Sequence, residues 1–242
     1  MYNFTTDLHT HTLVSHHAFS TVTENAYAAK RIGLYGFGKT DHSISLTDGA
    51  HEWHFRNTMS HIPKFIDGVR VFRGVEVNVM NPAGELDVPS SILKRLEWVI
   101  ASIHEPCMPN PSVDEVTQAW LCIAKNPYID CIGHCDAPLF DHETVIKEFG
   151  HRGKIVELNK GSTLYRSLEN VKKIALLCAK HAVMVAVNSD AHYMDSIGDF
   201  GCIPELLEEI GFPKELILNE GDPEKVERYV EERYERIKLA EK

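Results

Sequence analysis

The chain has 242 residues, a formal net charge of −10 and a hydrophobic content of 43%. This size allows one large core, and we predict a single domain that spans residues 1–242. The acidic balance argues against the basic face of a nucleic-acid-binding protein, and no apolar run is long enough to cross a bilayer. The first residues also lack the basic and apolar regions of a signal peptide, so we predict a cytoplasmic protein without nucleic-acid or membrane partners.

Strand-like and helix-like patterns alternate along the chain. Seven apolar or β-branched runs predict strands, at 4–9, 34–40, 69–75, 98–103, 128–133, 154–159 and 183–187. Thr21 and Glu24 form a capping-box pattern that begins a helix, and Gly33 would end it. Apolar residues at spacings of three and four predict further helices at 112–125 and 168–181. Alternating strands and helices form parallel sheets with right-handed crossovers, so we predict an α/β protein with enough strands to close a (βα) barrel.

The acidic tail at 222–242 has the pattern of an amphipathic helix. Arg228 and Arg233 alternate with glutamates on its polar side, which is typical of a solvated face. Four apolar residues would pack this helix on the core, namely Val226, Tyr229, Val230 and Ile237. We predict a surface helix rather than a binding motif.

Six of the seven predicted strands lead into a possible metal ligand. In chain order these residues are His9 and His11, His42, Glu76, His104, His134, and Asp190 with His192. A lone histidine beside a strand is usually an ordinary core or surface residue. The carboxyl ends of the strands converge in a (βα) barrel, however, so six such endings predict one polynuclear metal site there.

Histidine usage supports this interpretation. Eight of the 14 histidines lie within the first 61 residues: His9, His11, His16, His17, His42, His51, His54 and His61. Neutral imidazole is the commonest metal ligand, and carboxylates can bridge two ions. A site rich in histidine suits zinc, manganese or iron better than calcium or magnesium, which prefer oxygen ligands.

The ordered motifs resemble those of the PHP (polymerase and histidinol phosphatase) superfamily, and most closely its small stand-alone, YcdX-like phosphatases. They are Asp7-Leu8-His9-Thr10-His11, Thr40-Asp41-His42, Gly74-Val75-Glu76, Ile103-His104-Glu105-Pro106, Gly133-His134 and Ser189-Asp190-Ala191-His192. The resemblance covers nearly the whole chain. It implies a distorted seven-stranded (βα)7 barrel with three divalent metal ions at its mouth.

The resemblance also implies which residues hold each ion. The first ion would bind His9, His11, Glu76 and Asp190; the second Glu76, His104 and His134; and the third His17, His42 and His192. His17 is preferred to its neighbour His16 because it has the family's spacing after His11. Glu76 and Asp190 would be the catalytic carboxylates, and Asp7 would orient an imidazole without binding metal.

Three ions of zinc, manganese or iron imply hydrolysis of small phosphomonoesters by a hydroxide that bridges two of them. The sequence leaves four alternatives: a histidinol-phosphate phosphatase, a nuclease or phosphodiesterase of the same superfamily, an amidohydrolase, and a non-catalytic zinc module. The negative charge disfavours a nuclease. Amidohydrolases usually call for a carboxylated lysine, whereas here the fourth strand ends in His104. The oligomeric state stays open, and a homo-oligomer is compatible with the sequence.

Three further side chains are candidates for substrate binding. Lys39 lies just before the Thr40-Asp41-His42 motif, where an apolar residue is usual in the family. Lys160 follows the one predicted strand that does not end in a metal ligand. Each could add positive charge near a phosphate, although an ion-paired or solvated lysine is the ordinary alternative. His54 flanks a ligand-bearing segment and is a candidate substrate contact and proton donor.

Overall fold

Seven parallel strands form the centre of the molecule. The computed structural model describes residues 2–165 and 167–242. In spatial order the strands are β1 (Thr6–Thr10), β2 (Gly36–Lys39), β4 (Val69–Asn78), β5 (Trp98–Ser102), β6 (Cys131–Ile132), β7 (Ile155–Asn159) and β8 (Val185–Asn188). The short strand β3 (Phe65–Ile66) pairs with β4 in the antiparallel direction. The predicted α/β class and the seven parallel strands are therefore confirmed.

The sheet nearly closes into a barrel where β8 approaches β1. At the carboxyl ends of these strands, Thr10 and Ala191 form a parallel bridge. Farther down, the Asn219 side chain lies between the strands and donates to the carbonyl oxygens of Thr6 (2.8 Å) and Val187 (2.7 Å). Below the bridge, a side-chain amide thus takes the place of backbone pairing along the seam of the (βα)7 barrel.

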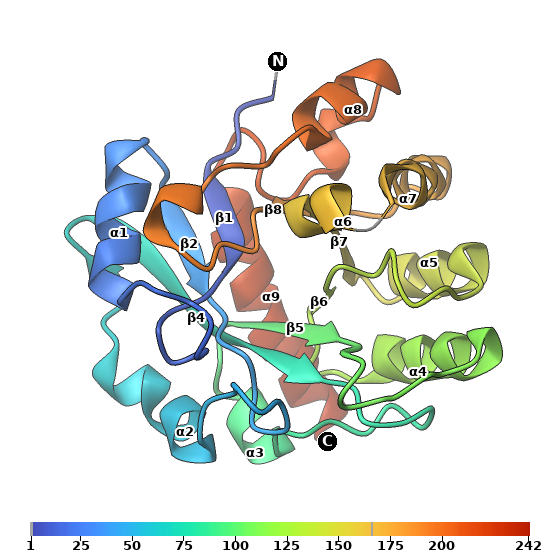
Figure 1. Cartoon of the computed structure of the whole chain (residues 1–242), viewed down its shortest axis with the longest axis horizontal. Helices are drawn as coiled ribbons and strands as arrows, with labels where there is room; N and C mark the ends of the chain where they lie inside the picture. Colours follow the sequence, from blue (N-terminus) through green and yellow to red (C-terminus); the bar gives the residue numbers. More distant parts are fainter. Residues whose placement is uncertain (1, 166) are drawn as a thin grey trace.

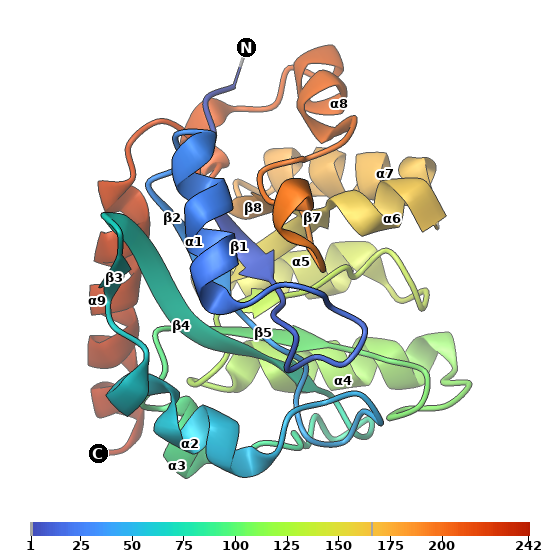
Figure 2. The same ribbon diagram turned by 60° about the vertical axis from the view of Figure 1, so that its left-hand side comes forward.

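Helices surround the strands (Figures 1 and 2). They are α1 (Val22–Arg31), α2 (Glu52–His61), α3 (Ser90–Leu93), α4 (Val113–Lys125), α5 (His142–His151), α6 (Lys160–Tyr165), α7 (Leu168–Lys180), α8 (Ile203–Glu209) and α9 (Glu224–Ala240), with short 3₁₀ helices η1 (Met194–Ser196) and η2 (Lys214–Leu216). The predicted capping box is present at Thr21 and Glu24, and Gly33 follows α1 with a φ of +79°. None of the helices in the described ranges is both long and apolar enough to span a membrane.

Helix α9 covers the end of the barrel at which the strands begin (Figure 2). Its apolar residues Val226 and Tyr229 belong to one buried cluster with Phe72 and Trp98, which lie toward the amino ends of β4 and β5. The predicted packing of this helix is correct, but the prediction that Arg233 is solvated is wrong. Arg233 is fully buried, and its Nε donates to Asp130 Oδ2 at 2.7 Å.

The interior of the barrel changes from apolar to polar along the strands. Alternate residues of a strand share a face, so Phe72 and Glu76 both point inward from β4, as do Ile155 and Glu157 from β7. Phe72 and Ile155 lie in the apolar cluster beneath α9. Glu76 and Glu157 are buried nearer the carboxyl ends. A pocket for charged chemistry therefore sits on a packed apolar floor.

Glu97 forms ion pairs with two arginines of β4. We expect these pairs to make the free energy of unfolding depend on pH in acid. Its Oε1 lies 2.9 Å from Arg70 Nη2 and 2.8 Å from Arg73 Nη2. Burial alone would raise the pKa of Glu97, but the arginines outweigh it and lower the pKa from 4.5 to about 2. A depressed carboxyl pKa stabilises the fold above about pH 4.5, and this contribution is lost as the pH falls towards 2.

We expect Glu97→Gln to lower the free energy of unfolding by about 3 kcal/mol at pH 7 and to flatten its decline between pH 4.5 and 2. Urea denaturation at a series of pH values measures both effects. Glu232→Gln, which changes an exposed residue of α9, is the matched control and should behave like the wild type. An unchanged acid profile in Glu97→Gln would contradict the assignment.

Candidate metal centre

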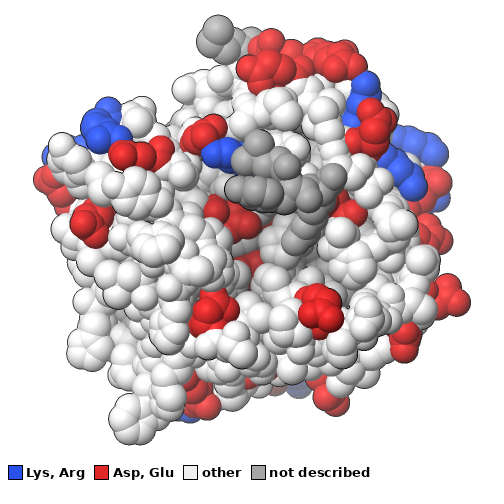
Figure 3. All heavy atoms as spheres, viewed as in Figure 1, with Lys and Arg blue, Asp and Glu red and all other residues white. Residues whose placement is uncertain are grey.

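The nine predicted ligand residues gather at the carboxyl ends of the strands. A cavity of about 730 Å³ opens there, and six of the nine line it: His17, His42, His104, His134, Asp190 and His192. The other three, His9, His11 and Glu76, lie buried around them. Figure 3 shows a hollow near the middle of this face, with acidic side chains inside it and most lysines and arginines towards the edges.

Glu76 lies at the centre of this group. Its Oε2 is 2.8 Å from His42 Nδ1 and 3.4 Å from His9 Nε2. Its Oε1 is 2.9 Å from His134 Nε2 and 3.6 Å from His104 Nε2. The two carboxylate oxygens therefore face different imidazoles, an arrangement that suits a carboxylate bridging two ions.

Asp190 lies beside two of the histidines, His9 and His11. Its Oδ1 lies 3.0 Å from His11 Nε2 and 3.5 Å from His9 Nε2. The backbone of Asp190 is in the left-handed region, with a φ of +57°, and His134 has a φ of +25°. Such conformations are costly for residues other than glycine and tend to persist at functional sites.

Histidines on loops form another part of the group. The His192 ring lies 4.2 Å from the His11 ring and 4.3 Å from the His17 ring, measured between centroids. Possible ligand atoms of His11, His42 and His192 lie within 4.8 Å of one another, as do those of His17, His42 and Asp48. The structure thus brings together all nine residues that the sequence analysis selected.

Several buried polar atoms at the centre have no hydrogen-bond partner among the described residues. They are His9 Nε2, His42 Nδ1, His192 Nε2 and Glu76 Oε2. His42 Nδ1 and Glu76 Oε2 are close, but neither makes a well-directed hydrogen bond. Buried polar atoms are nearly always satisfied in proteins, so a cluster of exceptions needs an explanation. Divalent cations, which bind nitrogen and carboxylate lone pairs, fit these residues.

In His9 and His192, protein acceptors hold the opposite ring nitrogen. His9 Nδ1 lies 2.7 Å from Glu157 Oε1, and His192 Nδ1 lies 2.9 Å from the carbonyl oxygen of Asp190. Such contacts fix the tautomer and direct the free Nε2 inward.

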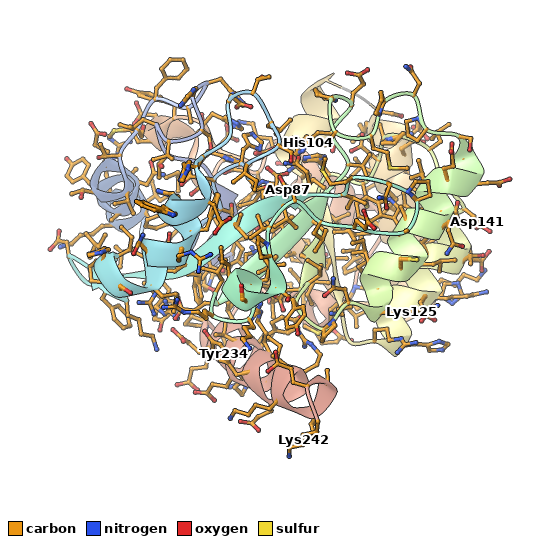
Figure 4. The ribbon with its side chains drawn as sticks, turned by 90° about the horizontal axis from the view of Figure 1, so that it is seen from below. Asp87, His104, Lys125, Asp141, Tyr234 and Lys242 are labelled. Carbon is orange, nitrogen blue, oxygen red and sulfur yellow. The ribbon has the colours of Figure 1, made fainter. Side chains whose placement is uncertain are left out.

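His104 is held in the same way by a chain of polar side chains. Its Nδ1 lies 2.7 Å from Asn78 Oδ1, and Asn78 Nδ2 donates to Asp87 Oδ2 at 2.7 Å. In Figure 4, His104 and Asp87 lie near each other at the same end of the molecule. This series of contacts orients the His104 ring, because Asn78 and Asp87 each have a fixed partner.

Burial and charge shift the pKa values of the proposed ligands in different directions. Burial alone would raise the pKa of Glu76, but His9, His42 and other imidazoles hold it well below the usual range. Burial lowers the pKa values of His11 and His104 to about 3. Burial alone would also lower the pKa values of His9 and His42, but neighbouring carboxylates, Glu157 for His9 and Glu76 for His42, outweigh it and raise them. Metal binds neutral imidazole, so ions bound by His9 and His42 would displace protons.

Glu157 is the main residue that sequence reasoning missed. It lies inside β7, whose end has no ligand, and it is almost fully buried between the His9 ring and the backbone N–H of His134 (2.7 Å). We predicted that Asp7 would orient an imidazole. Asp7 instead accepts from the backbone N–H groups of Ser189 (3.1 Å) and Gly198 (2.9 Å), and Glu157 holds the imidazole. A charged residue within an apolar strand was the available signal.

Lys39 and His54 lie outside the cavity, which corrects their assignment as substrate-binding residues. The Lys39 side chain is 2% exposed, and its Nζ lies 2.6 Å from Asp41 Oδ2. His54 Nε2 contacts Lys39 Nζ and lies 3.3 Å from the same Asp41 oxygen. Alternation along β2 turns Lys39 away from the barrel interior and towards α2, where it pairs with the buried carboxylate.

Lys160 does line the cavity, as expected for a substrate contact. It begins α6, directly after β7, and its Nζ forms an ion pair with Asp199. The side chain is 16% exposed, whereas that of Asp199 is 55% exposed. The ammonium group is thus near the mouth of the cavity, and its role in substrate binding stays a prediction.

Comparison with known proteins places the chain among phosphatases. No family model matches it. It is 39% identical over 239 residues to a probable phosphatase of Acetivibrio thermocellus, covering 97% of this chain and 98% of the relative. It is 42% identical over 237 residues to a probable phosphatase of Caldanaerobacter subterraneus, covering 96% and 92%.

A solved structure with the same fold is the histidinol phosphate phosphatase of Lactococcus lactis, in complex with zinc, L-histidinol and phosphate. The TM-score is 0.60 at 15% identity, and the match covers 86% of this chain and 94% of that one. This likeness concerns the fold alone, whereas the sequence identity to the bacterial relatives extends over nearly the entire chain. The chain belongs to the family of these probable phosphatases.

Proposed function

We propose that this chain is a metal-dependent phosphatase of the PHP superfamily, in its YcdX-like branch, and that it hydrolyses small phosphomonoesters at a trinuclear site. The observation that carries the proposal is the cluster of nine ligand-type residues around one cavity, with several of their buried atoms unpartnered. Membership of a phosphatase family and the zinc and phosphate bound by a protein of the same fold support it.

The first two proposed ions would share Glu76, and the third would have ligands of its own. The first would be held by His9, His11, Glu76 and Asp190, the second by Glu76, His104 and His134, and the third by His17, His42 and His192. When bound, divalent ions of zinc, manganese or iron supply Lewis acidity that acidifies water and neutralises phosphate charge. The protein's part is to keep Glu76 and Asp190 ionised and to fix the imidazole rings through Glu157, Asn78 and backbone acceptors.

The shape and charge of the cavity favour a small substrate. Its volume of about 730 Å³ lies within the range of small-molecule sites. A polymer with many phosphates would need a basic surface around the site, whereas this face carries acidic side chains in and beside the hollow (Figure 3). A compact phosphomonoester, whose dianion is drawn to the bound cations, meets both constraints.

Metal analysis combined with a substrate panel tests this function. We expect about three tightly bound ions per chain after desalting, and turnover of simple phosphomonoesters including an aryl phosphate, a mononucleotide and histidinol phosphate at differing rates. Phosphodiesters and oligonucleotides should be poor substrates. Full activity with no more than one bound ion would refute the trinuclear site, and preferential cleavage of diesters would refute the phosphomonoester assignment.

Lys160 is proposed to recognise a second negative group on the substrate. We expect Lys160→Ala to raise the KM about 3- to 5-fold for phosphomonoesters that carry such a group, because a partly exposed ion pair contributes up to about 1 kcal/mol. The kcat should hardly change, since the contact is made equally in the ground and transition states. Steady-state kinetics at low and high salt measure this, because salt should mimic the mutation.

The controls for Lys160 separate three outcomes. A simple aryl phosphate should be nearly unaffected, and Lys238→Ala, at an exposed position of α9, should match the wild type with every substrate. Equal loss of kcat on both substrates would place Lys160 at the reacting phosphate. No change with any substrate would leave Lys160 as the ion-pair partner of Asp199 alone.

A further inference from the structure

His17 differs from the other proposed ligands in its surroundings. Its side chain is 55% exposed, whereas those of His9 and His11 are fully buried. It lies in the loop between β1 and α1, farther from the end of β1 than His11. Packing therefore fixes its ring less firmly, and its orientation depends on specific contacts.

One carboxylate supplies such a contact. Asp48, on the loop that follows β2, places Oδ2 against His17 Nδ1. The same residue's carbonyl oxygen accepts from the backbone N–H of His16 at 3.0 Å. Asp48 thus holds the β1–α1 loop through both its side chain and its backbone, and among the described residues it makes the one hydrogen bond to the His17 ring.

The contact repeats a pattern seen at three other rings of the centre. Protein acceptors hold Nδ1 of His9, His104 and His192, and each leaves Nε2 free. With Asp48 on Nδ1, His17 likewise presents Nε2, and its ring lies 5.1 Å from the His42 ring. A carboxylate on the far nitrogen fixes the tautomer and increases the basicity of a ligating imidazole.

Asp48 also adds charge beside the proposed third ion. Its carboxylate lines the cavity, and an oxygen lies within 4.8 Å of possible ligand atoms on His17 and His42. The proposed ligands of this ion are all histidines, which bring no negative charge, whereas Glu76 and Asp190 serve the first two ions. A negative group here would offset part of the ion's charge without occupying a strand end.

We propose that Asp48 is the positioning residue of the third ion: it holds His17 with Nε2 towards the ion and makes binding of that ion depend on contact between two loops. This inference rests on the proposed trinuclear function. It predicts that the third ion is the one most readily lost. It also predicts that loss of the Asp48 carboxylate weakens this ion while the first two keep their affinity.

Titration of metal-free protein with Zn²⁺ alone, followed by calorimetry, tests the proposal. We expect three sites in the wild type, and in Asp48→Ala a weakest-site Kd raised about 10- to 100-fold with the other two unchanged. Asp48→Asn keeps an acceptor for His17 Nδ1, so its weakest-site Kd should lie between the values of the wild type and Asp48→Ala. Asp195→Ala removes an exposed carboxylate that pairs with Arg31 and does not line the cavity, and it should leave all three Kd values unchanged.

The outcomes separate this inference from the proposed function. Three unchanged sites in Asp48→Ala would overturn the role of Asp48 and leave the trinuclear proposal intact. Only two zinc-binding sites in the wild type would overturn both the role of Asp48 and the trinuclear proposal. Circular dichroism and the Tm of metal-free Asp48→Ala should match the wild type, and a weakening of all three sites together with a lower Tm would show a structural role instead.

Discussion

Replacing Glu76 by glutamine should lower phosphatase turnover by at least about 100-fold while the protein stays folded. In the wild type, Ser102 Oγ donates to Glu76 Oε1 at 2.6 Å. The amide of the variant keeps the size of the side chain, and its oxygen can still accept this hydrogen bond. What is lost is the negative charge that faces His9 and His42 on one side and His104 and His134 on the other.

Steady-state kinetics with an aryl phosphate, elemental analysis and thermal denaturation together measure this effect. Glu76→Gln should lose metal as well as turnover, and its Tm without metal should stay within a few degrees of the wild type. Glu85→Gln, at an exposed position, is the matched control and should keep full activity. Near-normal turnover with full metal content in Glu76→Gln would show that this residue is not a bridge.

The carboxyl ends of the strands could be predicted from sequence because strand ends carry a strong local signal. An apolar run followed by His or Asp is visible without any knowledge of long-range contacts, and barrel geometry then brings the endings together. Strand lengths were less accurate. The run 128–133 forms only a two-residue strand, β6, and just before it the Asp130 side chain accepts from the backbone N–H of Val99 at 2.9 Å.

Contacts between distant segments could not be predicted in this way. The partner of His9 is Glu157, which lies 148 positions later in the chain, and the seam of the barrel depends on Asn219. The pairing of His17 with Asp48 joins two loops, whose conformations have no periodic signal. Periodicity reports which face of an element is buried, but a specific polar partner is set by the tertiary fold.

Lys39 illustrates the same limit for charged residues. From sequence it could be a phosphate contact, because a lysine at a strand end usually reaches solvent. In the fold its Nζ pairs with Asp41, whose carboxylate is fully buried and also accepts from the backbone N–H of Thr12 at 2.6 Å. The loop that carries His17 is thereby anchored to the end of β2. Lys39 thus stabilises the metal centre indirectly, through Asp41.

We therefore expect Lys39→Met to destabilise the fold by about 3 kcal/mol, because removing one partner leaves the Asp41 charge buried and poorly compensated. For a chain of this size, that loss corresponds to a Tm lower by roughly 6 to 12 °C. Thermal and urea denaturation of metal-free protein measure the effect. Lys160→Met, which breaks a pair whose other partner is largely exposed, is the matched control and should change stability by at most about 1 kcal/mol.

A double variant shows whether the buried charge is the cause. Lys39→Met combined with Asp41→Asn removes both charges and keeps an acceptor for Thr12, so it should be more stable than Lys39→Met alone. If the double variant is no more stable, lost packing around the lysine stem explains the effect better than electrostatics. A Lys39→Met protein with an unchanged Tm and a raised KM for phosphomonoesters would contradict the buried ion pair and return Lys39 to the substrate site.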